Sequence, residues 1–123
     1  MIDMNKNIFG DALILCSDKP LTGYFRNGCC DTDDSDVGMH TVCIIATKEF
    51  LNFSKEVGND LSTPLPEFGF DGVKPGERWC LCALRWQEAF QNNSAPLVVL
   101  EATNEKTLDV IPMQDLIAHA YKS

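Results

Sequence analysis

The sequence predicts a compact two-layer α+β domain, in which about three helices cover one face of a small mixed or antiparallel sheet. Residues 41–46 are β-branched and continuously apolar, which is typical of a central strand buried on both faces. In later segments apolar residues recur at spacings of three and four, as they do in amphipathic helices. Strand-like and helix-like segments alternate without a regular βαβ rhythm, which favours α+β over a parallel α/β fold.

The first half of the chain contains one helix between irregular segments. Residues 11–16 are predicted to form a short strand. Thr47 is a suitable N-cap for a helix over residues 48–57, and Gly58 stands where a left-handed C-terminal residue is common. Residues 59–76 hold three prolines and three glycines, so a long loop is predicted there.

The second half of the chain is predicted to carry two more helices. A stripe of residues at helical spacing predicts a helix over residues 77–92. The stripe consists of Trp79, Cys82, Ala83, Trp86, Ala89 and Phe90. A buried strand is expected at residues 97–100, with residues 108–111 as its hairpin partner. A last helix is expected over residues 113–121.

Length, charge and hydropathy exclude several classes of protein. The 123 residues fit a single domain over residues 1–123, in which residues 1–10 are expected to be a flexible N-terminal segment. The net charge of −8 repels phosphate backbones and anionic membranes, so neither nucleic acid nor a membrane is an expected partner. The sequence shows no signal-peptide pattern and no apolar run that could span a bilayer. We therefore expect a cytoplasmic protein with reduced thiols, and a homodimer is the default assembly.

Six cysteines allow several kinds of chemistry. They are Cys16, Cys29, Cys30, Cys43, Cys80 and Cys82. No Cys-x-x-Cys pair is present, so a zinc site would have to combine Cys29 or Cys30 with His40 and Cys43. Alternatively, Cys43 and Cys82 are small apolar residues buried in the core. No cofactor is evident from the sequence, and zinc is the alternative that these cysteines leave open.

A thiol enzyme is a further alternative. Cys29 or Cys30 would act as the nucleophile and His40 as the base, if the fold brings them into contact. Arg26 and Arg78 lie near cysteines in the sequence, and a nearby cation favours a thiolate. The acidic run at residues 31–36 does not fit the EF-hand pattern, because glycine and glutamate are missing from their required positions.

The preferred hypothesis is a binding module without catalytic activity. A polar loop begins after Gly58 and ends at Pro66, and a segment rich in tryptophan and arginine follows it. Loops of this kind often carry binding residues, so a small ligand or a protein partner is expected there. The candidate ligand-binding residues are Asn59, Asp60, Ser62, Thr63, Arg78 and Trp79.

Three blocks of the sequence resemble a known family. They are PLTGYFRNGCC at residues 20–30, HTVC at residues 40–43, and GNDLSTP at residues 58–64 together with PGERWCLCA at residues 75–83. With residues 96–103, these blocks resemble the small bacterial "domain of unknown function 2237" family over nearly the whole chain. The resemblance implies a compact α+β two-layer domain that stands alone in the cytosol. It implies no activity and no catalytic residue.

Overall fold

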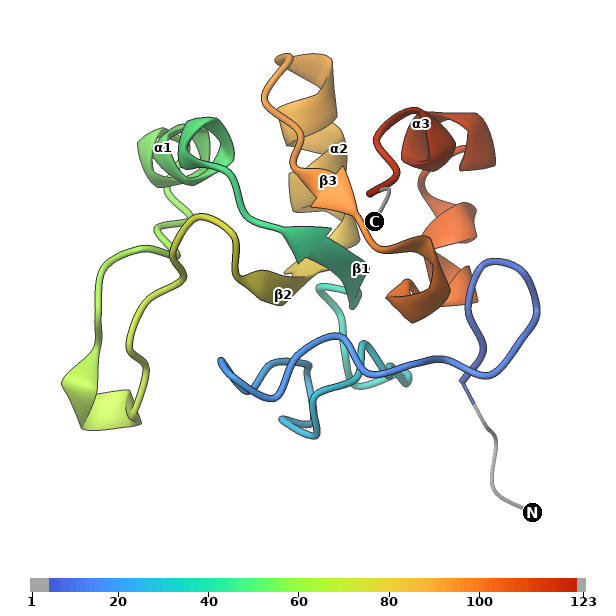
Figure 1. Cartoon of the computed structure of the whole chain (residues 1–123), viewed down its shortest axis with the longest axis horizontal. Helices are drawn as coiled ribbons and strands as arrows, with labels where there is room; N and C mark the ends of the chain where they lie inside the picture. Colours follow the sequence, from blue (N-terminus) through green and yellow to red (C-terminus); the bar gives the residue numbers. More distant parts are fainter. Residues whose placement is uncertain (1–4, 122–123) are drawn as a thin grey trace.

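The computed structural model describes residues 5–121 and contains a three-stranded antiparallel sheet (Figure 1). The strands are β1 at His40–Ile45, β2 at Arg78–Cys82 and β3 at Leu97–Val98. Their order in the sheet is β2-β1-β3. The α+β class and the central position of the strand in the middle of the chain are therefore confirmed.

Within residues 5–121, the chain also forms three α-helices and three short 3-10 helices. The α-helices are α1 at Lys48–Glu56, α2 at Ala83–Gln91 and α3 at Met113–Ala118. The 3-10 helices are η1 at Pro66–Phe68, η2 at Leu100–Ala102 and η3 at Glu105–Asp109. Figure 1 shows the α-helices on one side of the sheet and the N-terminal segment, drawn in blue, on the other side.

The side chains of β1 divide the interior into two clusters, because successive residues of a strand point to opposite faces. Val42 and Ile44 belong to the larger cluster, which packs against the helices. That cluster also contains Phe50, Leu51, Trp86, Ala89 and Leu116. Cys43 belongs to the smaller cluster on the opposite face, with Cys16, Cys30 and Cys80. The smaller cluster joins the N-terminal segment to the sheet.

Two disulfide bonds hold this smaller cluster together. They link Cys16 to Cys43 and Cys30 to Cys80, and all four residues are buried. The N-terminal segment is therefore covalently attached to both β1 and β2. This finding corrects the expectation that the thiols are reduced and that Cys43 is an unbonded apolar residue. Cys82 is unbonded but only half-buried, so it is not a core residue either.

The prediction of a helix over residues 77–92 is wrong in its first third. Residues 78–82 form β2, which pairs with β1 from Arg78 opposite Ile45 to Cys82 opposite His40. The helix begins only at Ala83. Long-range pairing with β1 outweighs the local helical spacing, because a strand also buries alternate residues such as Trp79 and Leu81.

Three smaller predictions also need correction. Residues 11–16 form no strand and make only an isolated bridge between Ala12 and Lys6. The strand expected at residues 97–100 ends at Val98. Its expected hairpin partner at residues 108–111 overlaps the 3-10 helix η3, which Asn104 caps by accepting a hydrogen bond from the Lys106 amide at 2.9 Å.

The helix after β1 is confirmed nearly as predicted. The Thr47 hydroxyl accepts a hydrogen bond from the Phe50 amide at 3.1 Å and caps α1, and Gly58 follows the helix with a φ of 90°. In the N-terminal segment, residues 1–4 lie outside the described range, while Asn7 and Ile8 are buried. Within residues 5–121, no helix is long and apolar enough to cross a membrane.

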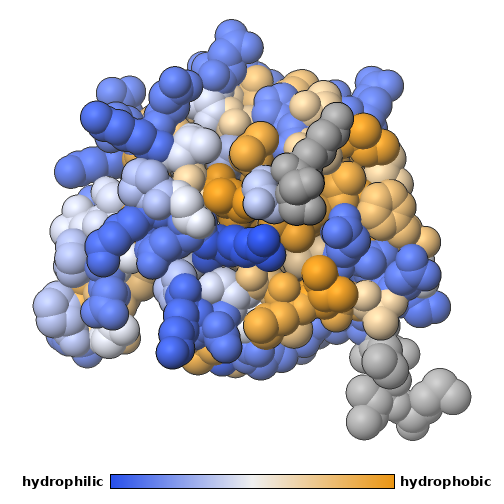
Figure 2. All heavy atoms as spheres, in the orientation of Figure 1, coloured by the Kyte–Doolittle hydropathy of each residue, from blue (hydrophilic) through white to orange (hydrophobic). Residues whose placement is uncertain are grey.

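The surface combines hydrophilic and hydrophobic areas. Figure 2 shows mainly hydrophilic side chains on the left, over α1 and the loop that follows it, and hydrophobic side chains gathered on the right. Exposed apolar residues of the N-terminal segment include Phe9, Ile14 and Leu15.

Candidate functional site

The most informative cavity lies at the outer edge of β2 and has a volume of about 250 Å³. Five parts of the chain line it: the N-terminal segment, the start of β1, the loop after α1, strand β2 and the first turn of α2. The lining residues are Gly23, Tyr24, Arg26, His40, Asn59, Leu61, Trp79, Cys80, Leu81, Cys82 and Arg85. The cavity therefore brings together Asn59, Trp79 and His40, three residues that the sequence had suggested for two different sites.

The charge of this cavity is opposite to that of the whole protein. The chain has 18 acidic and 10 basic residues, yet none of the described lining residues is Asp or Glu. Arg26 donates from Nη1 to the Gly23 carbonyl at 3.1 Å, and its guanidinium lies 5.3 Å from the centre of the Trp79 ring. Among the described residues, no carboxylate forms an ion pair with Arg26. Its charge is therefore available to a ligand.

Arg85 supplies a second guanidinium at the start of α2. Its Nη1 lies 3.3 Å from Glu88 Oε1, and both side chains are more than a third exposed. Exposed ion pairs between residues three or four apart on a helix contribute about 0.2–0.5 kcal/mol. A ligand carboxylate can displace such a weak partner.

A buried carboxylate fixes the orientation of His40. Its Nδ1 lies 2.7 Å from Asp36 Oδ1, and the Asp36 side chain is fully buried. Asp36 Oδ2 accepts hydrogen bonds from the Thr32 hydroxyl at 3.0 Å and from the His40 amide at 2.9 Å. An ionised carboxylate can only accept, so Nδ1 carries the proton of this bond and Nε2 of the neutral ring is an acceptor.

Two further contacts hold the His40 ring. Tyr24 stacks on it with the ring centres 6.1 Å apart. On the Gly38 side there is no room for a side chain, because a Cβ atom at Gly38 would lie 2.9 Å from His40 Cε1. The imidazole thus occupies one defined position at the edge of the cavity.

Cys82 is the unbonded thiol that lines the same cavity. It is the last residue of β2 and the N-cap of α2, and it stands opposite His40 in the β1–β2 pairing. Sequence reasoning missed Cys82 as a functional residue, because it treated residues 77–92 as one helix. The available signal was the junction itself, where alternation at Trp79 and Leu81 changes to helical spacing after Ala83.

The cysteines proposed from sequence as nucleophiles lie elsewhere. Cys30 is bonded to Cys80, so it has no thiol in this structure. Cys29 is unbonded and half-buried, but it does not line the cavity. Burial raises the pKa of the Cys29 thiol, and the negative charge of Asp31 raises it further. Both effects disfavour the thiolate that a nucleophile requires.

The loop residues chosen from sequence organise the loop itself. The Asp60 carboxylate accepts hydrogen bonds from the amides and hydroxyls of Ser62 and Thr63. These bonds, of which the one from the Thr63 hydroxyl is the strongest, lower the pKa of Asp60 to about 2. Arg78 does not line the cavity, and its guanidinium lies 5.8 Å from the centre of the Tyr121 ring.

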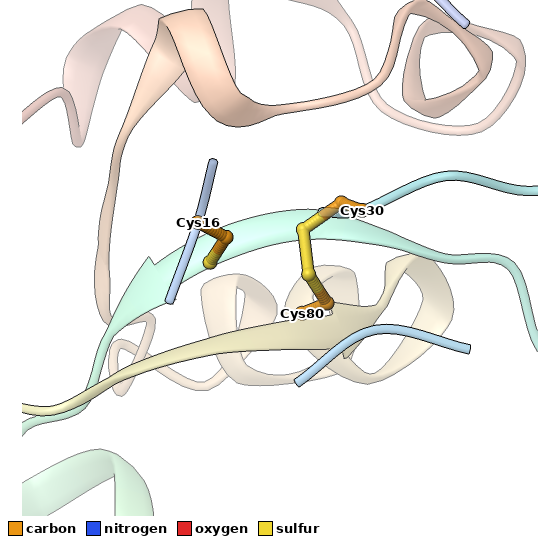
Figure 3. Close-up of side chains that lie close together, drawn as sticks. All are labelled: Cys16, Cys30 and Cys80. Carbon is orange, nitrogen blue, oxygen red and sulfur yellow. A yellow bond between two sulfur atoms is a disulfide. The ribbon is translucent and has the colours of Figure 1, made fainter. Parts of the chain in front are cut away.

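The cysteine cluster is a separate candidate site. The Sγ atoms of Cys16, Cys30 and Cys80 all lie within 4.8 Å of one another, and Figure 3 shows Cys16 beside the Cys30–Cys80 disulfide. Cys43 is bonded to Cys16 and lies in the same buried cluster, but its Sγ atom is not one of these three. Within residues 5–121, this is the group of side chains close enough to share a metal ion. Of the set suggested from sequence, Cys30 and Cys43 lie here, whereas His40 lies in the cavity.

Comparison with known proteins gives a family but no activity. No curated protein matches the chain. The bacterial family described as "Uncharacterized protein conserved in bacteria (DUF2237)" matches residues 6–120. This match covers nearly all of the sequence and includes every residue of the cavity and of the cysteine cluster. The chain therefore belongs to the DUF2237 family.

Proposed function

We propose that the protein binds a small anionic molecule in the cavity at the edge of β2. The observation that carries this proposal is the charge of the lining. Arg26, Arg85 and His40 converge there, and none of the described lining residues is acidic, although the protein as a whole is strongly acidic. Guanidinium groups bind carboxylates and phosphates through paired, charge-assisted hydrogen bonds.

The size and walls of the cavity define the class of ligand further. A volume of about 250 Å³ is small for a ligand site, which suits a metabolite of a few carbon atoms. Trp79 and Tyr24 provide aromatic surface, and the Asn59 side chain offers a polar contact. We infer a small organic carboxylate or phosphate as the ligand class.

Substituting either cavity arginine tests this proposal. Arg26→Gln and Arg85→Gln are expected to weaken the binding of succinate or inorganic phosphate about 10- to 100-fold each. A charge-assisted hydrogen bond contributes about 1.5–3 kcal/mol, and every 1.4 kcal/mol is a factor of ten in Kd. The measurement is an NMR titration that follows the Trp79 indole N–H and the arginine side chains of each variant.

Arg78→Gln is the matched control, because Arg78 is the neighbour of the cavity residue Trp79 on β2 but does not itself line the cavity. It is expected to bind both anions like the unsubstituted protein. If Arg78→Gln loses binding while the two cavity variants retain it, the ligand site is the surface around Arg78 and the polar loop that the sequence suggested. If neither anion shifts any cavity resonance, the proposal is contradicted.

The cysteine cluster supports a second candidate function, a structural zinc site in the reduced protein. Cys16, Cys30 and Cys80 would supply three buried thiolate ligands, and Cys43 in the same buried cluster is the candidate for the fourth. Zn–S bonds of about 2.3 Å place the sulfur atoms about 3.8 Å apart in a tetrahedron. All three Sγ atoms lie within 4.8 Å of one another, and the bonded pair Cys30–Cys80 would have to separate after reduction to reach that spacing.

Zinc binding can be measured directly after reduction of both disulfides with a phosphine. We expect one zinc ion per chain, and a higher unfolding temperature when zinc is added, because metal bound only by the native state stabilises it. Cys16→Ser should lose the zinc, and Cys29→Ser is the control that should keep it. A reduced protein that binds no zinc would contradict the proposal.

The cytoplasmic location predicted from sequence gives this second candidate a biological setting. Reducing compartments keep thiols unpaired, so a cytoplasmic protein would present the four cysteines as metal ligands rather than as disulfides.

The homodimer and the absence of nucleic-acid and membrane partners also stay predictions. Size-exclusion chromatography with light scattering measures the first of them.

A further inference from the structure

A free thiol and an oriented imidazole belong to two residues that are paired across β1 and β2 at the end of the cavity. Cys82 and His40 are direct partners in the antiparallel β1–β2 register. Side chains of such partners lie on the same face, with their Cβ atoms about 4.5–5.5 Å apart. Both residues line the cavity, so both are open to a bound ligand.

An irregularity in β1 creates this pairing. The register shifts between His40 and Val42, so that Thr41 is an extra residue on the β1 side. In a regular strand His40 would share the face of Val42, which packs against the helices. A bulge turns the side chains before it to the other face, and here it brings His40 into register with Cys82. Thr41 is itself fixed in the core by a 2.8 Å hydrogen bond to Thr107.

The orientation of His40 is the one that a general base needs. Asp36 holds Nδ1–H, which leaves Nε2 as the acceptor that can take a proton from a thiol. The contacts of Tyr24 and Gly38 keep the ring in this position. Thiol, imidazole and buried carboxylate thus have the three roles of a nucleophile, a base and a group that orients the base.

The N-terminus of α2 completes the site. Cys82 is its N-cap, and α2 is nine residues long. The Ala83 amide donates to the Met39 carbonyl at 2.9 Å. The first amides of an α-helix have no acceptor within the helix itself. Unpaired amides at a helix N-terminus stabilise negative charge that develops beside them.

We propose that Cys82 is a catalytic nucleophile that transfers an acyl group from a small anionic ester or thioester to water. His40 is the base, and Asp36 is the positioning residue that orients it. This inference rests on the proposed anion site, because Arg26 and Arg85 would hold the negative group of the substrate. The reacting carbonyl would then lie between Cys82 and the amides at the start of α2.

The reaction is balanced without a cofactor. The Cys82 thiol proton moves to His40 Nε2 while the sulfur attacks the carbonyl carbon. The tetrahedral intermediate collapses, the bond to the leaving alkoxide or thiolate breaks, and that group takes the proton from His40. A water molecule then attacks the resulting thioester, gives a proton to His40, and releases the acid as Cys82 regains its proton. The net change is one ester or thioester and one water converted into one acid and one alcohol or thiol.

The test uses the full chain without reductant, so that the other four thiols stay bonded. The probe is the 4-nitrophenyl monoester of succinic acid, compared with neutral 4-nitrophenyl acetate. We expect release of nitrophenolate, and one acyl group on Cys82 detected by mass spectrometry of the disulfide-intact peptides. His40→Gln is expected to slow acylation about 100-fold, the lower end of the usual contribution of a general base.

Three variants separate chemistry from structure. Cys82→Ser should lose the adduct, and Cys29→Ser, which changes the other free thiol, should keep it. Gly38→Ala retains every reacting group but displaces the ring of His40, so it should slow acylation while the unfolding temperature changes little. If Cys29 is acylated as fast as Cys82, or if His40→Gln acylates like the unsubstituted protein, the proposal is overturned.

The same measurements distinguish failure of this inference from failure of the proposed anion site. Succinate that shifts the cavity resonances without any acylation of Cys82 would overturn the catalytic role and retain the binding site. A different result would overturn the anion site and retain the thiol chemistry. In that case Cys82 would be acylated in a His40-dependent way, but the charged ester would react no faster than the neutral one, and Arg26→Gln would not change the rate. Site-resolved alkylation with iodoacetate and iodoacetamide checks both points with a second pair of charged and neutral probes.

Discussion

Cys30→Ser is expected to lower the free energy of unfolding by about 4 kcal/mol under non-reducing conditions. The Cys30–Cys80 bond joins residues that are 50 positions apart, and the entropy lost by the unfolded chain grows with the length of the closed loop. The Cys16–Cys43 bond joins residues that are 27 positions apart, so removing it should lower the free energy of unfolding slightly less, by about 3.5 kcal/mol. The free energy of unfolding of such domains is typically about 5–15 kcal/mol, so the loss of either disulfide removes a large fraction of the total stability.

Urea denaturation followed by tryptophan fluorescence measures this effect. Cys29→Ser is the matched control, because it changes the neighbouring cysteine without breaking a bond, and it should lie within about 0.5 kcal/mol of the unsubstituted protein. Reductant added to the unsubstituted protein should cause a loss at least as large as Cys30→Ser does. A stability that is equal for Cys30→Ser and Cys29→Ser would show that the bond does not stabilise the fold in solution.

Trp86→Ala is expected to lower the free energy of unfolding by about 3–5 kcal/mol, the usual cost of removing a large aromatic side chain from a core. Trp86 is fully buried and has the largest buried side chain of the described residues. Its indole N–H donates to the Pro96 carbonyl at 3.3 Å, and its ring stacks on Phe90 with the ring centres 5.3 Å apart. The truncation therefore removes packing against several elements and leaves a buried carbonyl unpaired.

Thermal and urea unfolding of Trp86→Ala test this prediction. Leu84→Ala, an exposed position of the same helix, is the control and should change the free energy of unfolding by less than about 0.5 kcal/mol. The result also concerns the cavity, because α2 carries Cys82 at its N-terminus and Arg85 in its first turn. A loss below 1 kcal/mol would mean that the interior around α2 is not closely packed.

The sequence predicted those parts of the fold that depend on local pattern. The run of apolar, β-branched residues in β1 can be satisfied only by burial on both faces, and the structure places β1 in the centre of the sheet. The Thr47 cap fixed the start of α1, because a side-chain acceptor at that position satisfies an amide that the helix cannot. Hydrophobic periodicity alone could not separate β2 from α2, because Trp79 and Ala83, four residues apart, fit both the alternation of a core-facing strand and the spacing of a helical stripe.

The candidate site could be predicted only in part. His40, Asn59 and Trp79 were singled out by residue type and sequence context, and they do line one cavity. Cys82 and Arg26 were not assigned to it, because their positions there depend on contacts between distant parts of the chain. The orientation of His40 depends on a bulge in β1 and on the buried carboxylate of Asp36. Asp36 belongs to an acidic run, and a run of this kind suggests exposure to solvent rather than burial.

The sequence by itself determined the fold class, the family, the acidic character and the presence of enough apolar residues for one core. The tertiary structure alone decided which cysteines are bonded, which thiol is free beside the histidine, and where positive charge gathers. The physical reason is the distance along the chain over which each interaction acts. Propensity, capping and burial pattern act between neighbours in the chain, whereas disulfides, strand register and the electrostatics of a cavity depend on residues that only folding brings together.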